Sequence, residues 1–177
     1  MLELPHIAGS RGGSITLQTR LAFPIPNEQA LEPDSQLVRM FQGLLAKHPR
    51  WTVRKAPCGV YNCAGHVWAS RRTAVYGEEW YKKILQDDGY RLLTDPEASP
   101  SHGDLAIYQT ADSAGKFLHV GMVTHLEEIL VQSGASVSSK WPWVLSKWNS
   151  AGEVLHHFAD VPFDNGTWEV RFWTDRP

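Results

Sequence analysis

The first part of the chain carries apolar residues at the spacing of an α-helix. They recur every three or four positions, as a helix with one buried face requires: Leu37, Val38, Met40, Phe41, Leu44 and Leu45. Asp34 or Ser35 is suited to cap this helix, because a short side chain with an oxygen atom accepts a hydrogen bond from a free backbone N–H. Pro49 lies beyond the end of the pattern, where it cannot continue a helix.

Two further helices are predicted downstream. Asn62 is a good cap for a helix that begins at Cys63 or at the next residue and runs to about Arg72. A third helix is expected over Glu78–Asp88, since acidic residues in its first turn suit the helix dipole and Gly89 can end it.

From residue 90 onward the pattern changes to short apolar runs, which are typical of strands. The last run alternates strictly, with Trp168 and Val170 on one side and Glu169 and Arg171 on the other. The predicted strands are Tyr90–Leu93, Leu105–Tyr108, Phe117–Val123, Ile129–Gln132, Val144–Trp148, Val154–His157 and Trp168–Trp173.

Helices that precede strands predict an α+β domain, with N-terminal helices packed on a C-terminal antiparallel sheet. Residues 1–33 are rich in Gly, Pro and Ser and are expected to form an extended arm with little regular structure. Residues 34–177 then form a single domain. Within it, Trp51–Tyr61 is predicted to be a loop, because Pro57 and Gly59 interrupt the segment.

The composition argues against several classes of function, namely binding to nucleic acid, binding to anionic lipid and spanning a membrane. The chain has 177 residues and a formal net charge of −2, which gives no electrostatic footprint for nucleic acid or for anionic lipid. Its apolar runs are too short to cross a membrane. Residues 1–10 lack the pattern of a secretory signal, so we expect a cytoplasmic protein, one delivered by a signal-independent secretion system, or a piece of a longer chain.

The chemistry of the sequence centres on Cys63. A thiol becomes a good nucleophile when a helix N-terminus or a nearby imidazolium lowers its pKa. Tyr61 and Asn62 lead into the predicted helix, so Cys63 lies where the helix dipole would stabilise a thiolate. Free backbone N–H groups here can hold an oxyanion, and the small side chain of Ala64 permits close approach of a substrate. Tyr61, Asn62 and Ala64 are therefore the candidate oxyanion or substrate-binding residues.

His119 is the candidate base, because it lies inside an apolar strand that follows another strand announced by Gly103-Asp104. Both residues also have an ordinary structural interpretation. A histidine in a strand can be a satisfied core residue, and a cysteine at a helix start can be a small buried apolar residue.

Several short motifs occur in an order that resembles a known family. They are Tyr61-Asn62-Cys63, His119-Val120-Gly121, Ser146-Lys147-Trp148, His156 ahead of Val161-Pro162, and Phe172 to Arg176. Over roughly residues 55–177 the chain is similar to the papain-like NlpC-type cell-wall peptidases and CHAP-like amidases, in particular to a bacterial branch with these motifs. The resemblance implies the papain-like NlpC-type fold.

The resemblance also implies a mechanism, in which Cys63 attacks a carbonyl carbon to give a thioester and His119 carries the proton. NlpC-type enzymes usually place a third polar residue on the strand after the base, where it fixes the imidazole ring. At that distance this chain has Val131 and Gln132. Ser146 is then the first alternative for the third residue, because its motif matches, and His156 is another.

Other interpretations of the same residues remain open. Cys58, Cys63 and His66 are spaced so that they can be interpreted as metal ligands, with His119 or His125 as the fourth, although we predict no metal and no cofactor. Lys140 and Lys147 lie among tryptophans and can be interpreted as contacts to nucleic acid or sugar. Because the chain as a whole is mildly acidic, this last interpretation is not adopted.

The sequence therefore predicts a cysteine peptidase or amidase that cleaves an amide bond in a protein or in a peptidoglycan stem peptide. A bacterial toxin effector with a cognate immunity protein as partner fits this reading by analogy. The alternatives are a catalytically inactive binding module on the same fold, or a cysteine-dependent deamidase or acyltransferase that uses the same residues.

Overall fold

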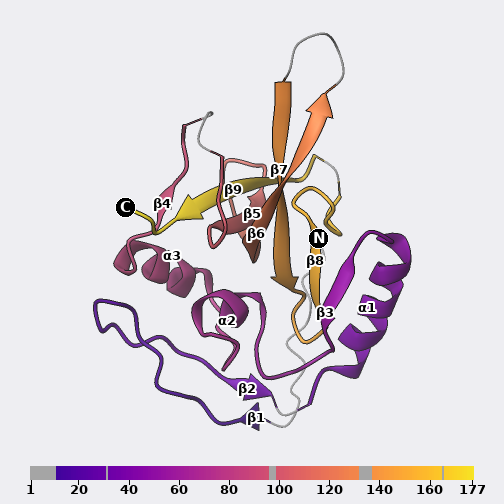
Figure 1. Ribbon diagram of the computed structural model, residues 1–177. Coiled ribbons are helices and arrows are strands. Elements are labelled where there is room, and N and C mark those ends of the chain that lie inside the picture. Colours follow the sequence, from indigo (N-terminus) through magenta and orange to yellow (C-terminus); the bar gives the residue numbers. More distant parts are fainter. Residues whose placement is uncertain (1–10, 31, 96–98, 132–136, 165) are drawn as a thin grey trace.

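The computed structural model describes residues 11–30, 32–95, 99–131, 137–164 and 166–177 (Figure 1). The helices found there are α1 (Ser35–Lys47), α2 (Cys63–Trp68) and α3 (Glu78–Asp87). The strands are β1 (Arg11–Gly12), β2 (Gln29–Ala30), β3 (Thr52–Lys55), β4 (Arg91–Leu92), β5 (Leu105–Thr110), β6 (Phe117–Val131), β7 (Val137–Lys147), β8 (Glu153–His157) and β9 (Trp168–Thr174).

Seven of these strands form one antiparallel sheet in the order β3-β8-β7-β6-β5-β9-β4, and β1 pairs with β2 separately. Helices therefore precede most of an antiparallel sheet, which confirms the predicted α+β class. No helix in the described ranges is long and apolar enough to span a membrane.

The two central strands are longer than the sequence pattern predicts. β6 and β7 pair from Gly121↔Ser146 to Val131↔Val137, and the register shifts between Val123 and His125. The ribbon that they form projects beyond the rest of the sheet (Figure 1). The apolar runs predicted as two strands, 117–123 and 129–132, thus belong to one strand as far as Val131, while Gln132 lies outside the described residues.

Helix α1 forms where its apolar spacing predicts. The Asp34 carboxylate accepts hydrogen bonds from the backbone N–H groups of Gln36 and Leu37, which confirms one of the two predicted caps. Phe41 is the buried residue of the helix and packs with Trp51, Ala151 and Val154. The helix is thereby attached to β8 and to the turn between β7 and β8.

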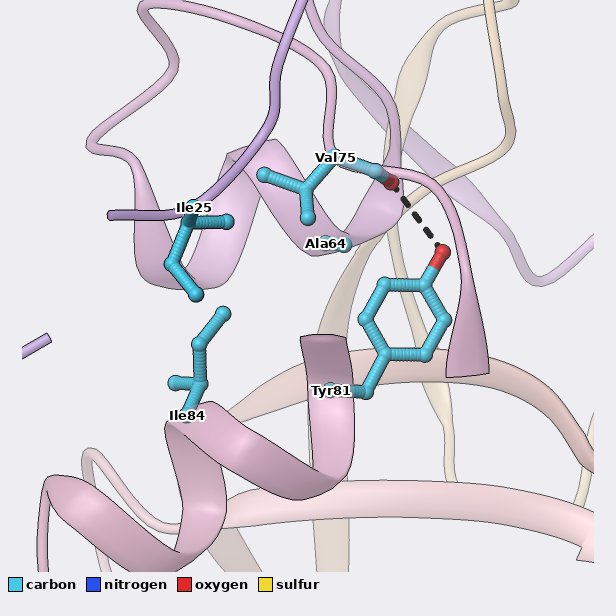
Figure 2. Close-up of a cluster of buried hydrophobic side chains, with 5 residues drawn as sticks. All are labelled: Ile25, Ala64, Val75, Tyr81 and Ile84. Carbon is cyan, nitrogen blue, oxygen red and sulfur yellow. Dashed lines mark hydrogen bonds between the residues drawn. The ribbon is translucent and has the colours of Figure 1, made fainter. Parts of the chain in front are cut away.

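Helices α2 and α3 pack together with part of the N-terminal arm. Their shared cluster contains Ile25 from the arm, Ala64 from α2, and Tyr81 and Ile84 from α3 (Figure 2). The Tyr81 hydroxyl donates a hydrogen bond of 3.0 Å to the backbone oxygen of Val75, and this bond ties α3 to the segment after α2. The described part of the arm has little regular structure beyond two short strands, yet Ile25 is only 3% exposed.

The two faces of the sheet bury different clusters, because side chains alternate along each strand. Leu105 and Ile107 of β5 pack with Val120 of β6 on the face that α2 covers. Ala106 and Tyr108 of β5 belong to a separate, aromatic cluster on the opposite face. The strand pairs Ile107↔Val120 and Tyr108↔His119 carry this alternation from β5 to β6.

Two sequence-based predictions of local structure are wrong. The segment Trp51–Tyr61, predicted as a loop, contains the edge strand β3, whose residues are all exposed and give no apolar alternation. Helix α2 ends at Trp68 instead of near Arg72. The cause is local, because Ser70 and Arg71 have φ values of 49° and 63°, a left-handed conformation that no α-helix contains.

Candidate functional site

Cys63 is the first residue of α2, and Asn62 is its N-cap. The Asn62 side-chain oxygen accepts hydrogen bonds from the backbone N–H groups of Gly65 (2.9 Å) and Val75 (3.2 Å). Its side-chain nitrogen donates to the backbone oxygen of Val75 at 2.6 Å. Asn62 therefore holds the turn that carries the thiol, and these internal contacts occupy both ends of its amide group.

The Cys63 thiol reaches the edge of β6. The backbone groups of Val120, Ala64 and Cys63 itself lie near the sulfur and favour its thiolate form. Val120 lies just beyond Gly121↔Ser146, the pair that begins the β6–β7 ladder. Here α2 packs against β6 through Cys63, Val67 and Trp68.

Burial dominates the electrostatics of the thiol. Cys63 packs against the cluster of Leu105, Ile107 and Val120, and this desolvation raises the pKa of the thiol. The nearby backbone groups and the positive charge of Lys147 oppose this rise in pKa without cancelling it. The resting thiol is therefore protonated at neutral pH, while the groups that favour a thiolate already surround it.

His119 lies next to Val120 on β6 and is 3% exposed. Its ring stacks on Trp148, with 4.0 Å between the ring centroids and 4° between the ring planes. Tyr108 lies across the β5–β6 pair, with a ring-centroid distance of 5.8 Å to His119. Strand alternation directs the imidazole to the aromatic face of the sheet, whereas the Val120 side chain faces α2.

The imidazole of His119 is neutral. Burial lowers its pKa well below the usual value, and the charges of His156 and His66 lower it further when they are protonated. Its Nε2 atom is buried without a hydrogen-bond partner. Among the described residues no hydrogen bond joins His119 to Cys63. The thiol on α2 packs against Val120, whereas the imidazole of His119, the preceding residue of β6, is directed to the other face of the sheet.

Ser146 and His156, the two alternatives for the third residue, contact each other. Ser146 Oγ and His156 Nε2 are 2.8 Å apart, and His156 Nδ1 lies 2.8 Å from the backbone oxygen of His157. Because a carbonyl oxygen can only accept, Nδ1 carries the hydrogen and the Ser146 hydroxyl donates to Nε2. Burial lowers the pKa of His156 to about 4, which agrees with a neutral ring.

Gly121 is the residue that lets Ser146 lie close to β6. A Cβ atom at Gly121 would lie 2.4 Å from a methyl group of Val144 and 2.5 Å from Ser146 Oγ. His119 precedes Gly121 by two positions and thus shares its side of the strand. Ser146 is therefore the diagonal cross-strand neighbour of His119.

A buried carboxylate, which no local pattern in the sequence indicates, contacts residues within and on both flanks of α2. Glu153 of β8 accepts hydrogen bonds from the Tyr61 hydroxyl (2.5 Å) and from Arg71 Nε (2.8 Å), and its Oε2 lies 4.0 Å from His66 Nε2. Burial favours a higher pKa for Glu153, but the bonds from Arg71 and Tyr61 outweigh it and lower that pKa. Tyr61 is 2% exposed, so its hydroxyl supports the site from within.

Lys147 is likewise a structural part of the site. It is completely buried, and its amino group donates to the backbone oxygens of Cys58 (2.9 Å) and Ala151. Burial lowers the pKa of Lys147 to about 8. The only signal in the sequence was its place in the motif Ser146-Lys147-Trp148, since a lysine is seldom fully buried.

The interpretation of the cysteines as metal ligands gains no geometric support. In the part of the chain that the structure describes, no group of three or more His, Cys, Asp or Glu residues is arranged to hold a metal ion. His66 Nε2 instead faces Arg71 and Glu153. Cys58 and Cys63 are both free thiols in half-buried positions.

Comparisons with protein-family models, with curated proteins and with solved structures find no match. What the site can do chemically therefore rests on its residues alone. A protonated thiol lies at a helix start against Val120, and a neutral imidazole lies at the preceding position of the same strand, β6.

Proposed function

We propose that this chain is a papain-like cysteine hydrolase of the NlpC type, which cleaves an amide bond with Cys63 as nucleophile and His119 as general base. One observation carries the proposal. Cys63, at the start of α2, packs against Val120, the residue that directly follows His119, and the Val120 backbone favours the thiolate form. The contact brings the proposed nucleophile to the strand residue that follows the proposed base.

In the proposed reaction the Cys63 proton passes to the imidazole of His119 as the sulfur attacks the carbonyl carbon. The carbonyl oxygen becomes an oxyanion, and the backbone N–H groups of Cys63 and Ala64 are placed to stabilise it. The carbon–nitrogen bond breaks, and His119 gives its proton to the departing amine. Water then attacks the thioester, His119 takes one of its protons, and the thiol is restored with release of a carboxylic acid.

The resting protonation states fit a site that is activated by its substrate. Burial keeps the thiol protonated and the imidazole neutral, so charge separation in the empty site is unfavourable. A substrate carbonyl that accepts the developing charge removes this obstacle. Hydrogen bonds between catalytic groups are often long in free enzymes and tighten only when substrate binds.

Ser146 is the residue that we propose to orient His119, with His156 behind it. Ser146 is the diagonal neighbour of His119, and its hydroxyl donates to His156, so its remaining lone pairs are available to the imidazole. This arrangement combines the two alternatives that the sequence left open. Ser146 would contact the base directly, and His156 would fix the rotation of the Ser146 hydroxyl.

The first test compares the two thiols of the protein. Iodoacetamide alkylation of Cys63 is expected to slow when a substrate-like peptide amide occupies the site, because the bound amide covers the sulfur, whereas the alkylation rate of Cys58 should not respond. Cys63→Ala and His119→Ala are expected to abolish amide cleavage with the fold intact, and Cys58→Ala is the matched control that retains it. Full cleavage activity in Cys63→Ala would disprove the assignment.

The compartment of the substrate can be tested by expression in bacteria. Toxicity that is confined to the periplasm and lost in Cys63→Ala indicates a peptidoglycan stem peptide. Toxicity in the cytoplasm, again lost in the variant, indicates a protein substrate and a toxin effector, for which an immunity protein is the expected partner. Mass spectrometry of the product separates hydrolysis from deamidation and acyl transfer, because only the acceptor differs.

A second candidate function is a binding module that has lost catalysis. The observation that favours it is the raised pKa of the Cys63 thiol together with the unpartnered Nε2 atom of His119. A catalytically inactive module predicts equally slow alkylation of Cys63 and Cys58 under every condition.

A further inference from the structure

His119 is the last ring in a series of four parallel rings. The other three are Trp148, Trp51 and His48. The ring centroids of His119 and Trp148 are 4.0 Å apart, those of Trp148 and Trp51 are 5.5 Å apart, and those of Trp51 and His48 are 4.4 Å apart. The successive interplanar angles are 4°, 6° and 18°. We call these four residues the stacked series.

The far end of the stacked series is fixed by hydrogen bonds. His48, the C-cap of α1, has its Nδ1 atom 2.6 Å from a carboxylate oxygen of Asp160, in the loop after β8. Trp51 donates from Nε1 to the backbone oxygen of the same Asp160 at 2.9 Å. Trp51 is 7% exposed, so one loop residue holds the two outer rings of the series.

The inner end of the series lacks such bonds. Trp148 Nε1 and His119 Nε2 are both buried without a hydrogen-bond partner in the described structure. The stacking contact therefore has to set the plane of the imidazole at this end, together with Tyr108 across the strand pair. A ring without directional bonds turns easily when the ring that packs on it moves.

We propose that Trp51, held by Asp160 and His48, is a positioning residue for His119, which acts through Trp148 to fix the plane of the imidazole and to exclude water from it. The inference rests on the proposed function, because it assigns the stacked ring as the base of that reaction. Trp51 touches neither substrate nor Cys63 in this assignment. Its contribution to the reaction is the orientation of the base.

The other groups around His119 do not replace this contact. His156 and His66 are the ionisable groups whose charges act on the imidazole, and each disfavours its protonated form. Tyr108 contacts the ring at a tilt of 42°. Trp148 itself also packs against Phe163, with the rings edge to face at 65°, so Trp51 supplies the parallel support on this ring.

The experiment measures the titration of the His119 ring by NMR in the full chain, with the His119 signal assigned by its loss in His119→Gln. In Trp51→Ala the titration midpoint is expected to move upward towards the ordinary histidine range, because water reaches the ring. Trp51→Phe keeps a parallel ring and is expected to restore the midpoint. Trp80→Ala is the matched control, since Trp80 is a half-buried tryptophan in a different cluster.

Amide cleavage provides a second readout. Trp51→Ala is expected to lower kcat by roughly tenfold to a hundredfold, the effect of a small misplacement of a catalytic group, with KM changed less than twofold. If Trp51→Ala does not fold, Asp160→Ala tests the same point, because it removes the partner of His48 and leaves the tryptophan in place.

The outcomes separate the two proposals. An unchanged His119 midpoint in a folded Trp51→Ala, or an equal change in Trp80→Ala, overturns the positioning role. If Cys63→Ala retains activity, the proposed function fails, while the NMR titration still decides whether Trp51 orients the ring.

Discussion

Arg71 and Glu153 are 82 residues apart in the chain and close α2 against β8, with Arg71 Nε and Glu153 Oε1 at 2.8 Å. Arg71 reaches this position because its φ of 63° turns the chain back after α2, where its backbone N–H donates to the Gly65 oxygen. The Tyr61 hydroxyl binds the same carboxylate from the segment before α2. Both ends of the short helix that carries Cys63 are thus fixed to one side chain.

Glu153→Ala is expected to destabilise the fold by about 2–3 kcal/mol. Breaking a buried ion pair typically costs about 3–5 kcal/mol, and the value is reduced here because the Arg71 side chain is 38% exposed and can regain water. The midpoint of urea unfolding measures the loss. Asp175→Ala is the control, since its pair with Arg20 is exposed on both sides and contributes about 0–1 kcal/mol. Equal losses in the two variants would contradict the structural role of Glu153.

Stability is expected to fall when the pH drops below about 6.5, the ordinary histidine pKa. Burial lowers the pKa of His66 and of His156 to about 4, so between these pH values the unfolded chain binds more protons than the folded one. Each histidine accounts for roughly 3 kcal/mol over this range, from 1.36 kcal/mol per pKa unit. Below about pH 4.3 the lowered pKa of Glu153 adds to the loss in the same direction.

Urea unfolding at pH 7.5 and at pH 5.0 measures this dependence. His156→Gln keeps a polar side chain at the Ser146 contact but removes one titrating ring, so the difference between the two pH values should shrink. His102→Gln is the control, because His102 is exposed and should leave the difference unchanged. A difference of the same size in His156→Gln would show that another group causes the acid sensitivity.

Gly121→Ala is expected to destabilise the protein and to disturb the candidate site. The added methyl group would lie 2.4 Å from Val144 and 2.5 Å from Ser146 Oγ, and overpacking of this kind costs about 1–3 kcal/mol. Because β6 and β7 are hydrogen bonded here, the strands cannot separate locally. Amide cleavage should fall more than stability alone explains, since the methyl group displaces Ser146.

Gly43→Ala provides the matched control. Gly43 lies within α1, and nothing stands within 4 Å of the position that its Cβ atom would take. Alanine favours a helix interior over glycine by about 0.5–1 kcal/mol, so this variant should be more stable than the natural chain. If both glycine variants lower the urea midpoint, steric crowding at Gly121 is not the cause.

The sequence predicted the elements whose apolar spacing is regular. Helix α1 lies where the three- and four-residue intervals and its cap indicated, and α3 lies where its acidic first turn and Gly89 indicated. Strands β5 and β9 lie within a residue or two of the predicted apolar runs. Edge strand β3 was missed because all four of its residues are exposed, so burial imposes no pattern on them. The exposed Glu127 and Glu128 interrupt the apolar run of β6 and concealed its continuity.

Only part of the candidate site could likewise be predicted from the sequence. The cap at Asn62 and the position of Cys63 follow from neighbouring residues, and the sequence predicted both. The Arg71–Glu153 pair and the stacked series join segments that are tens of residues apart, and nothing local in the sequence signals them. A buried charge such as Glu153 can be recognised only when the fold shows which partners compensate it.

Lys147→Met is expected to destabilise the protein by about 1–3 kcal/mol, even though methionine fills most of the lysine volume. The amino group of Lys147 satisfies the backbone oxygens of Cys58 and Ala151, and removing a donor leaves buried acceptors without a partner, which costs about this much. Removal of a buried charge offsets part of the loss, because burial already lowers the pKa of Lys147 to about 8.

Lys140→Met, an exposed position on the same strand, is the control and should change the free energy of unfolding by less than about 0.5 kcal/mol. Since Cys58 lies in the segment that leads to Cys63, the Lys147 variant should also increase the alkylation rate of Cys58. An unchanged Cys58 rate together with unchanged stability would mean that Lys147 does not hold this segment in place.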